Sequence, residues 1–364
     1  MATMKALVYK APGTIELQTR PKPVIQASTD AIIRILHASI CGTDLHVLKG
    51  DVPTIQPGLI MGHEGVGIVE EVGASVHMVA AGDRVVIVSQ TCCGFCKFCR
   101  TGAVSHCEDG GWQLGNKIDG TQAEYVRIMH ANLSLYKISD SITGHIALMF
   151  SDVLPTSMEC GTLHGNVQPG NTVVIIGAGP IGISCLLTAR LYSPMKVVMV
   201  DVDNGRLDRA RAMGVEALNS KDPNSKDALL QLTDGRGFDS VIEAVGIPAT
   251  FELAQELVAV GGSIANVGVH GTKVDLHLEK LWDRNISEYP TTLEMTNILI
   301  PEGINTQLLN GTTIPQLMRL VESGILDVSC LVTHSFPITE GEKAYSTFQT
   351  AAQSGALKVT IDMC

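Results

Sequence analysis

Short runs of β-branched and other apolar residues, separated by glycine and proline, recur through the first 150 residues of the chain. Runs of this kind occupy residues 31–37, 66–72 and 84–88. Short apolar runs bounded by glycine are typical of strands joined by tight turns. The pattern therefore predicts a β-rich domain in this part of the chain, for which a barrel is one arrangement.

The pattern changes near residue 171, where strand-like and helix-like segments begin to alternate. Apolar strands are predicted at residues 172–176, 196–201, 240–244 and 262–267, with helices at 181–191 and 206–213. Strands that are apolar on both faces and alternate with helices indicate a parallel sheet covered on both sides. Beyond residue 297 the pattern loosens, and it predicts one helix at 314–323 and a closing strand at 357–362.

The composition is that of a globular protein with two domains. The chain has 364 residues, of which 45% are hydrophobic and 17% charged, and one domain usually takes about 100–200 residues. Lys and Arg total 26 against 37 Asp and Glu, which gives a formal net charge of −11. Such an acidic chain repels nucleic acid and anionic membranes, so neither is expected as a partner.

Neither a signal peptide nor a membrane span is expected from the sequence. The uncharged stretch at residues 172–189 is interrupted by glycines and a proline, which favours a strand, a turn and a buried helix over a membrane helix. Five of the ten cysteines fall between Cys92 and Cys107. Without a secretory signal, such a cluster is typical of metal binding rather than of disulfides. The chain is therefore expected to be cytoplasmic.

A glycine-rich motif joins the predicted strand at 172–176 to the helix that follows it. In dinucleotide-binding domains the first glycine of such a motif permits a tight turn, and the second lets the backbone approach the pyrophosphate. The third lets the helix pack close to the sheet. The residues of this predicted cofactor site are Gly177, Gly179, Pro180, Ile181 and Gly182.

Asp201 ends the next predicted strand, 19 positions after Gly182. A carboxylate there can accept hydrogen bonds from the adenosine ribose and repels a 2′-phosphate, which predicts NAD in preference to NADP. Arg206 could instead attract that phosphate, or it could be an ordinary charge on a solvated helix. A structural turn followed by a surface aspartate is the alternative to the whole site.

Four cysteines with short spacings form the strongest single motif, and they are Cys93, Cys96, Cys99 and Cys107. Four thiolates can close a tetrahedron around Zn²⁺ with no open position, which is the arrangement of a structural zinc site. Cys92 is a fifth thiol beside the set, so a shift of one residue stays open. Cys93 is preferred because it gives equal gaps of two residues.

A second group of polar residues is dispersed, and spacing alone does not join its parts. It comprises Cys41 with the following Gly-Thr-Asp-Leu-His, then His63 with Glu64, and then Asp152. A lone cysteine or histidine is usually an ordinary core or surface residue. Asp152 could simply cap the helix that follows it.

In their order, these motifs resemble those of the zinc-dependent medium-chain alcohol dehydrogenases. The resemblance runs from the opening Met-Lys-Ala-Leu-Val-Tyr to the closing Ala-Leu-Lys-Val-Thr-Ile at residues 356–361. Within that family the chain most resembles the microbial secondary-alcohol dehydrogenases, because of the segments at residues 111–116 and 119–125. The resemblance implies an α/β fold with a GroES-like β-rich catalytic domain in two segments, 1–153 and 297–364. Between them lies a Rossmann domain, a doubly wound parallel sheet that binds NAD, at 154–296.

The resemblance implies that Cys41, His63 and Asp152 are the ligands of a catalytic zinc, with Glu64 beside the metal. Many relatives have cysteine at the position of Asp152. A hard oxygen ligand in place of a thiolate leaves more positive charge on zinc, so a stronger Lewis acid that is bound less tightly is expected. With the structural site, the expectation is two zinc ions per chain.

The resemblance also implies roles for residues near the reaction. Thr43 and His46 match a proton relay, and Trp112 matches a residue of the substrate pocket. The positions that match contacts to the nicotinamide or the pyrophosphate are Thr156, Val267, Val269 and Lys358. The structural alternatives are a backbone hydrogen bond for Thr43, surface positions for His46 and Lys358, and core packing for Trp112. Gly42 replaces a basic residue of some relatives, which puts a further phosphate contact there in doubt.

The activity implied by the resemblance is the interconversion of small alcohols, with secondary alcohols favoured, and the corresponding ketones or aldehydes. In this chemistry zinc lowers the pKa of the bound alcohol toward neutrality, and hydride passes from the alkoxide to the nicotinamide. A polyol dehydrogenase on the same scaffold is the alternative enzyme. An idle NAD-binding protein is the alternative outside enzymes, although such a protein has no need of an open metal site. A homo-oligomer, either a tetramer or a dimer, is also implied.

Overall fold

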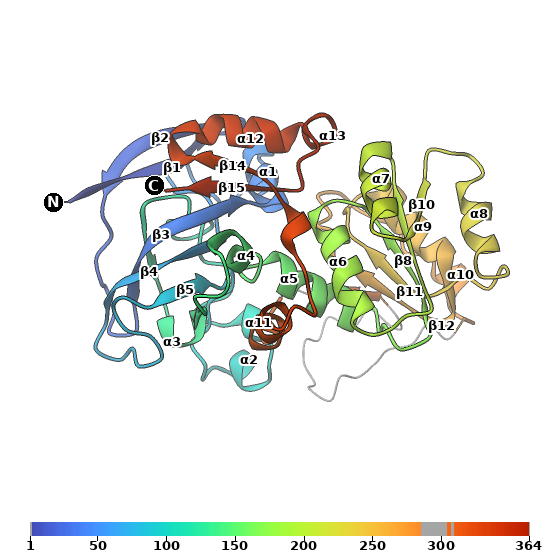
Figure 1. Ribbon diagram of the computed structural model, residues 1–364, viewed down its shortest axis with the longest axis horizontal. Helices are drawn as coiled ribbons and strands as arrows, with labels where there is room; N and C mark the ends of the chain where they lie inside the picture. The colour runs from blue at the N-terminus through green and yellow to red at the C-terminus, as the bar shows by residue number, and fades with distance from the viewer. Residues whose placement is uncertain (1, 285–303, 307–308, 364) are drawn as a thin grey trace. The chain divides into compact units, whose positions relative to one another are not determined.

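The computed structural model describes residues 2–284, 304–306 and 309–363, and they form two compact units (Figure 1). The first unit contains Met1–Asp152 and Asn310–Cys364, and the second contains Val153–Leu309. The expected boundary at 296 and 297 lies outside the described residues. The unit boundary falls later because β13 (Ile304–Thr306) pairs in parallel with β12 (Val258–Asn266) and so extends the sheet of the second unit.

The first unit is built on a seven-stranded sheet in the order β14-β15-β3-β4-β5-β7, with β6 paired to β3. A separate antiparallel pair is formed by β1 and β2. The bounds of these strands are β1 (Thr3–Ala11), β2 (Thr14–Pro21), β3 (Ala31–Ile40), β4 (Gly65–Val72), β5 (Arg84–Ile87), β6 (Tyr125–Ile128), β7 (Leu135–Lys137), β14 (Val332–Pro337) and β15 (Lys358–Asp362).

The helices of the first unit are mostly short and lie between its strands (Figure 1). They are α1 (Gly42–Lys49), α2 (Lys97–Arg100), α3 (Ala131–Ser134), α4 (Gly144–Leu148), α11 (Ile314–Glu322), α12 (Gly341–Gln349) and α13 (Ala351–Ser354). One core is formed where apolar side chains of β3, β4 and β5 meet, among them Ile33, Ile35 and Val85. The predicted β-rich fold of this part of the chain is confirmed.

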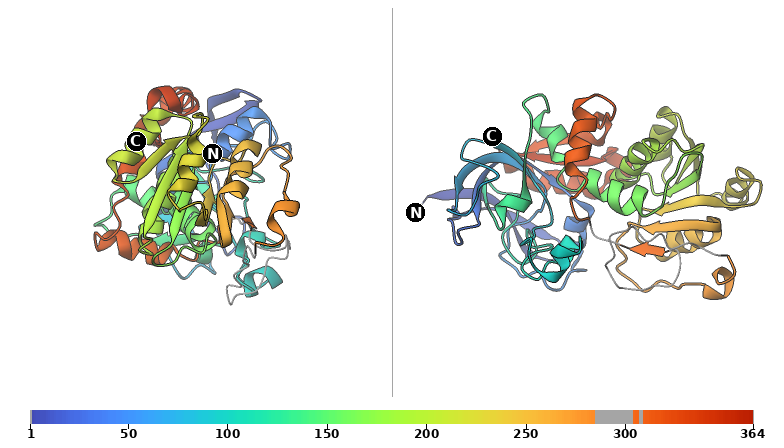
Figure 2. Two further views of the ribbon diagram at one scale, coloured as in Figure 1. Left: turned by 90° about the vertical axis from the view of Figure 1, so that its right-hand side faces the viewer. Right: turned by 90° about the horizontal axis from the view of Figure 1, so that it is seen from below.

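The second unit is a six-stranded parallel sheet in the order β10-β9-β8-β11-β12-β13 (Figure 1, Figure 2). This is the strand order of a dinucleotide-binding doubly wound fold, and it reverses between β8 and β11. Its other strands are β8 (Thr172–Ile176), β9 (Lys196–Asp201), β10 (Glu216–Asn219) and β11 (Phe238–Glu243). Every residue of β8 is buried, as expected for a strand covered on both faces. The predicted α/β fold class is confirmed.

In the second unit, α5 and a π-helical turn precede the first strand, and the other helices follow the strands in turn. They are α5 (Val153–Thr156), a π-helical turn at Ser157–Leu163, α6 (Pro180–Arg190), α7 (Asn204–Ala212), α8 (Ser225–Gln231), α9 (Pro248–Leu257) and α10 (Leu278–Leu281). Because the strands are parallel, β8, β9, β11 and β12 all end at one edge of the sheet. Ligands of such folds bind beyond this edge, near the reversal of strand order.

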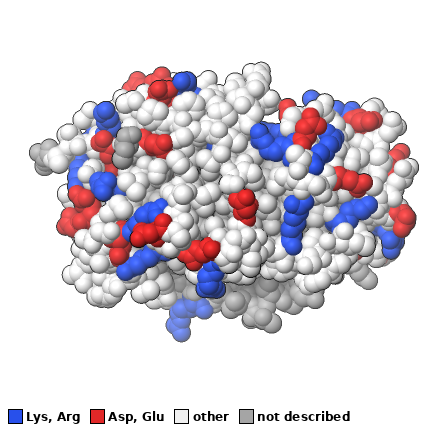
Figure 3. Space-filling model, in the orientation of Figure 1, with Lys and Arg blue, Asp and Glu red and all other residues white. Residues whose placement is uncertain are grey.

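Charged side chains of both signs are interspersed on the face of the molecule shown in Figure 3. Among the described helices, none combines the length and the apolar character that a bilayer crossing requires.

Candidate functional site

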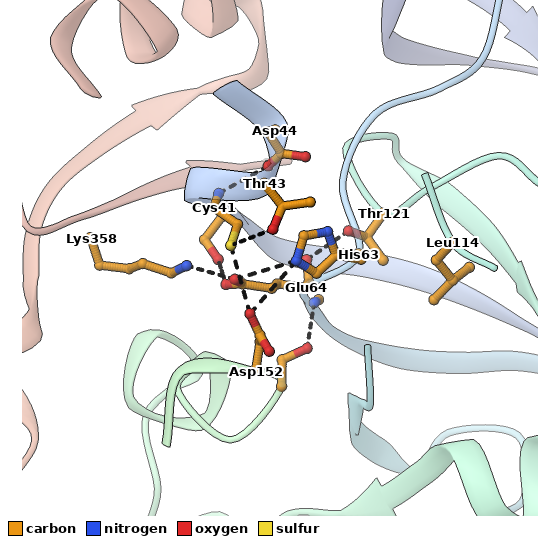
Figure 4. A network of polar contacts seen from close by, with 12 residues as sticks. Cys41, Thr43, Asp44, His63, Glu64, Leu114, Thr121, Asp152 and Lys358 are labelled. Carbon is orange, nitrogen blue, oxygen red and sulfur yellow. Dashed lines mark hydrogen bonds and ion pairs between the residues drawn. The ribbon is translucent and has the colours of Figure 1, made fainter. Parts of the chain in front are cut away.

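Four side chains from distant parts of the sequence converge in the first unit (Figure 4). Cys41, His63, Glu64 and Asp152 each offer one ligand atom, and these atoms all lie within 4.8 Å of one another. Cys41 Sγ and His63 Nε2 both lie 3.7 Å from Asp152 Oδ2. Tetrahedral zinc with ordinary bond lengths needs ligand atoms roughly 3.3–3.8 Å apart. The thiol, imidazole and carboxylate therefore fit a zinc ion.

Cys41 lies where β3 ends and α1 begins. Its backbone is extended, with φ of −103°, and its N–H donates to Asp44 Oδ2 at 2.9 Å. The same carboxylate oxygen accepts from Gln122 Nε2 at 3.2 Å, and Tyr345 Oη donates to Gln122 Oε1 at 2.8 Å. Burial raises the pKa of Asp44, and His63 opposes that rise. This buried chain of hydrogen bonds fixes the backbone that presents the Cys41 thiol.

His63 depends on the glycine before it. Gly62 has φ of +89°, and a Cβ there would lie 2.6 Å from Gln122 Cγ, so only glycine fits without rearrangement. Burial lowers the pKa of His63, but hydrogen bonds to Asp152 and Cys41 outweigh burial and raise the pKa well above its ordinary value. The cluster without metal therefore holds a proton on the imidazole, and a metal ion must displace that proton to bind.

The Glu64 carboxylate lies beside the cluster and is held by a buried ion pair. Its Oε1 accepts from Lys358 Nζ at 2.6 Å, and its Oε2 accepts from Ser39 Oγ. The same Oε1 lies 3.8 Å from His63 Nε2. Lys358 and Glu64 are each only 1% exposed. Burial lowers the pKa of Lys358, but Glu64, Cys41 and Asp152 raise it overall, so the ammonium stays charged. Lys358 is thus buried beside the metal cluster, and the surface alternative is wrong.

Thr43 and Trp112 contact residues of the same cluster, and His46 lies further along α1. Thr43 Oγ1 lies 3.6 Å from Cys41 Sγ. His46 follows three residues later on α1 and is hydrogen bonded through Nδ1 to Asp51 at 2.9 Å. Residues three apart share one face of a helix. The Trp112 ring meets the His63 ring edge to face, with centroids 6.2 Å apart, and its Nε1 donates to the Leu114 carbonyl.

The four predicted zinc-binding cysteines also converge in the first unit. Cys96 Sγ lies 3.5 Å from Cys99 Sγ and 3.9 Å from Cys107 Sγ, and Cys93 Sγ lies 3.9 Å from Cys99 Sγ. Zinc–sulfur bonds of about 2.3 Å place tetrahedral sulfurs about 3.8 Å apart. Backbone N–H groups, that of Cys99 foremost, lower the pKa of Cys96 to about 6. Burial raises the pKa of Cys92 to about 11, and Cys92 is not a member of the converging set.

The glycine motif forms the turn between β8 and α6 in the second unit. Gly177 has φ of +106°, which disfavours any other residue. A Cβ on Gly182 would lie 1.7 Å from the Gly177 carbonyl oxygen, so the third glycine is what allows α6 to approach the sheet. Gly179 precedes α6, and Pro180 and Ile181 begin it. The turn thus aims the helix N-terminus and its free N–H groups beyond the sheet edge, as a pyrophosphate site requires.

Asp201 is the last residue of β9 and is fixed beside this turn. Its Oδ2 accepts from the Ala178 N–H at 2.7 Å, and its Oδ1 accepts from the Val202 and Asp203 N–H groups at 2.7 and 2.9 Å. The Arg206 guanidinium lies 3.8 Å from Asp201 Oδ2. The side chain of Asp201 is 6% exposed. The carboxylate is thus oriented by the backbone and partly neutralised by Arg206.

The other residues matched to the nicotinamide lie at the ends of elements in the second unit. Val267 follows β12, and its N–H donates to the Glu243 carbonyl at 2.8 Å. Val269 is 56% exposed. Thr156 ends α5, and its neighbour Ser157 donates to the Ile181 carbonyl at 3.2 Å. Val267 therefore lies beyond the carboxyl end of β12. Thr156 directly precedes Ser157, which is bonded to α6.

The sequence did not predict the residues whose hydrogen bonds support the group of Cys41, His63, Glu64 and Asp152. They are Ser39, Asp44, Gln122 and Tyr345. Asp44 carried a local signal, since an acidic side chain three residues after a helix cap can bond back to the cap N–H. Gln122 and Tyr345 carried none, because their contact joins residues 223 positions apart.

Comparison with known proteins gives the class of the chain. Residues 27–140 match the alcohol dehydrogenase GroES-like domain family, and residues 180–298 match the zinc-binding dehydrogenase family. An alcohol dehydrogenase of Cupriavidus necator is 35% identical over 381 residues, covering 99% of each chain. The L-threonine 3-dehydrogenase of a Shewanella species is 32% identical, covering 99% of this chain and all of that one.

The solved structure of zinc dependent alcohol dehydrogenase 2 from Streptococcus pneumonia, in its apo form, is 46% identical. It superposes with a TM-score of 0.90 and covers 99% of this chain and 98% of that chain. The chain therefore belongs to the zinc-dependent medium-chain alcohol dehydrogenase family, as its motifs predicted. It is an oxidoreductase of that family.

Proposed function

We propose that this chain is an NAD-linked dehydrogenase that interconverts secondary alcohols and ketones, with a catalytic zinc held by Cys41, His63 and Asp152. The observation that carries the proposal is the convergence of those three ligand atoms, with Cys41 Sγ and His63 Nε2 each 3.7 Å from Asp152 Oδ2. When bound there, zinc polarises the substrate oxygen and lowers the pKa of an alcohol toward neutrality. Three protein ligands leave a fourth position for the substrate, which a structural site lacks.

The residues around the cluster supply the remaining steps. Thr43 Oγ1, beside the Cys41 thiol, is placed to accept the proton that leaves the substrate hydroxyl and to pass it on. His46 has Nδ1 bonded to Asp51, which fixes a tautomer whose Nε2 can accept that proton. Trp112, against the His63 ring, supplies an apolar wall on which the carbon substituents of a substrate can pack.

Glu64 is proposed to tune the metal rather than to take part in proton transfer. Its carboxylate is engaged by Lys358 and Ser39, and Glu64 Oε1 stays 3.8 Å from His63 Nε2. A negative charge at that distance adds to the field of the ligands while leaving the fourth position to the substrate. A second, structural zinc on the four cysteines completes the proposed metal content of two ions per chain.

NAD is the proposed cofactor because of Asp201. Its carboxylate lies beside the glycine turn, held by the Ala178 N–H at 2.7 Å, where ribose hydroxyls can donate to it and a 2′-phosphate would be repelled. Arg206 would favour a 2′-phosphate if it were free, but its guanidinium lies 3.8 Å from Asp201. The turn formed by Gly177, Gly179 and Gly182 would let the backbone and the N-terminus of α6 approach the pyrophosphate. Thr156, Val267 and Val269 would face the nicotinamide. Lys358 is committed to Glu64, so its pyrophosphate role is not proposed.

The preference for secondary alcohols rests on the pocket motif around Trp112 and on the relative named L-threonine 3-dehydrogenase, since carbon 3 of threonine is a secondary alcohol.

The described cysteines are free of disulfides, which favours a reducing compartment such as the cytoplasm. A tetramer or dimer is proposed from the family resemblance, and light scattering on the purified chain tests it.

The test of the function is turnover of propan-2-ol or butan-2-ol with NAD, followed by the absorbance of NADH, before and after zinc removal by a chelator. Activity that is lost on chelation and restored by Zn²⁺ supports the proposal. Sorbitol, propan-1-ol and L-threonine in the same panel test the substrate class, and turnover of sorbitol alone would make the chain a polyol dehydrogenase. No zinc-dependent turnover of any of them would overturn the proposed activity.

A further inference from the structure

Among the described residues, a third group of metal-binding side chains converges outside the two centres above. His37 on β3, His145 on α4 and Asp362 at the end of β15 each offer a ligand atom, and these atoms lie within 4.8 Å of one another. The ligand atoms of the Cys41, His63, Glu64 and Asp152 group (the catalytic cluster) and those of the four cysteines (the cysteine cluster) also lie within 4.8 Å of one another. We propose that this group, the His37 cluster, is a third metal site, which takes a divalent transition metal such as Zn²⁺.

The ligand atoms of the His37 cluster face one point. His37 Nδ1 lies 2.7 Å from Asp362 Oδ1, and His145 Nε2 lies 2.9 Å from the same oxygen. The two rings are tilted by 48° with centroids 4.3 Å apart. Two imidazoles and a carboxylate suit zinc and its neighbours among the divalent metals. A bound ion would replace the protons between these atoms and widen their separations by only about 0.5 Å.

The fold holds these three side chains in place. The antiparallel pairing of β15 with β3 puts Asp362 directly opposite His37. The Ser335 hydroxyl donates to Asp362 Oδ2 at 2.5 Å, which orients the carboxylate and leaves Oδ1 toward the histidines. Gly144 makes room for the His37 ring, because a Cβ there would lie 2.3 Å from the ring carbon Cδ2. Supported ligands of this kind are typical of metal sites.

Charge and exposure also suit a cation. Asp362 supplies a carboxylate to the two imidazoles, and its Oδ1 lies within hydrogen-bond distance of both rings. The exposed fractions of the side chains are 24% for His37, 36% for His145 and 30% for Asp362. An ion from solvent can reach them, and three protein ligands leave a position for water.

A metal here would stabilise the segments that also carry the catalytic cluster. β3 runs from His37 toward Cys41, and β15 runs from Lys358 to Asp362. An ion that binds the folded site and not the unfolded chain raises stability by mass action. The His37 cluster shares no ligand with the catalytic cluster, so this site can exist whether or not the proposed activity is correct.

The test is metal binding by tag-free, zinc-loaded protein. Zn²⁺ is added in excess, free metal is removed by gel filtration, and bound metal is counted by mass spectrometry. We expect the wild-type chain to retain one ion more than His145→Asn and Asp362→Asn, with at least about tenfold weaker binding in the variants. His77→Asn is the matched control, since His77 is an exposed histidine of the same unit, and it is expected to behave as wild type.

The midpoint of thermal unfolding gives a second readout. Added Zn²⁺ is expected to raise it in the wild type and in His77→Asn, and to leave it unchanged in His145→Asn. Activity without added metal is expected to be the same in all three proteins, which shows that the variant folds. Equal metal content and an equal thermal response in the wild type and in His145→Asn would overturn the proposal and leave the His37 cluster as a hydrogen-bonded network alone.

Discussion

Lys358 and Glu64 form a buried ion pair with 2.6 Å between Nζ and Oε1, although they lie 294 positions apart in the sequence. The pairing of Val359 with Ile40 places the start of β15 next to the end of β3, and so brings Lys358 beside the proposed metal ligands. The ammonium balances part of the negative charge that Glu64, Asp152 and a Cys41 thiolate concentrate there. The pair therefore holds the Glu64 carboxylate close to Cys41, His63 and Asp152.

Replacing Lys358 by methionine should strongly destabilise the protein. The change keeps most of the side-chain volume but leaves Glu64 buried without its cation, and breaking a buried pair from one side costs about 3–5 kcal/mol. Urea unfolding measures this loss. Lys343→Met is the matched control, because Lys343 is 68% exposed in its pair with Glu340, and exposed pairs contribute about 0–1 kcal/mol. A loss below about 1 kcal/mol for Lys358→Met would show that Glu64 does not depend on the ammonium.

Asp152→Ala should remove one metal ion and most of the activity. The ligand is lost while the cysteine cluster is untouched, so the metal content should fall from two ions to one in protein prepared without excess zinc. Cys107→Ser should do the reverse, losing the structural ion first. Asp140→Ala, at an exposed aspartate of the same unit, is the control. Unchanged metal content in Asp152→Ala would show that this carboxylate is not a ligand.

Asp201→Ala should weaken NAD binding and relax the discrimination against NADP. Hydrogen bonds to a charged group contribute about 1.5–3 kcal/mol, so the ratio of kcat/KM for NAD to that for NADP should fall by roughly tenfold or more. Steady-state kinetics with both cofactors measure the ratio. Asp208→Ala, on the exposed side of α7, should leave the ratio unchanged. The same ratio in Asp201→Ala and the wild type would mean that the ribose contact lies elsewhere.

Gly182→Ala should impair cofactor binding through packing. The added Cβ would lie 1.7 Å from the Gly177 carbonyl oxygen, so α6 must move away from the turn, at a cost of about 1–3 kcal/mol. The expected results are a raised KM for NAD and a lower unfolding temperature. Gly271→Ala is the control, since nothing lies within 4 Å of a Cβ there. Normal NAD kinetics in Gly182→Ala would contradict the proposed turn.

The sequence predicted those features whose cause is local. The strand at β8 follows from a continuous apolar run, and the cysteine cluster and glycine turn follow from short spacings. The ends of the helices were less accurate: α7 begins at Asn204 instead of 206, because the Asp203 side chain caps it by accepting the Arg206 N–H at 2.9 Å. A cap of this kind is a polar contact that an apolar pattern does not report.

The catalytic cluster could not be assembled from spacing, because its ligands come from distant strands and turns. Only the resemblance to a family joined Cys41 to His63 and Asp152. The Lys358–Glu64 pair and the His37 cluster both depend on how β15 pairs with β3. The register between two strands so far apart in the sequence cannot be predicted from the residues of either strand alone. The division between the two units after Leu309 could not be read from the sequence for a similar reason, since the three residues of β13 join the second sheet through pairing with β12.

Anomalous diffraction from crystals at the zinc absorption edge would test the central claim most directly. We predict a strong peak among Cys41 Sγ, His63 Nε2 and Asp152 Oδ2, and another within the cysteine cluster. Soaking with a chelator should remove the first peak and the alcohol-dependent reduction of NAD together. Active crystals with no anomalous density among those three side chains would contradict the assignment of the catalytic metal.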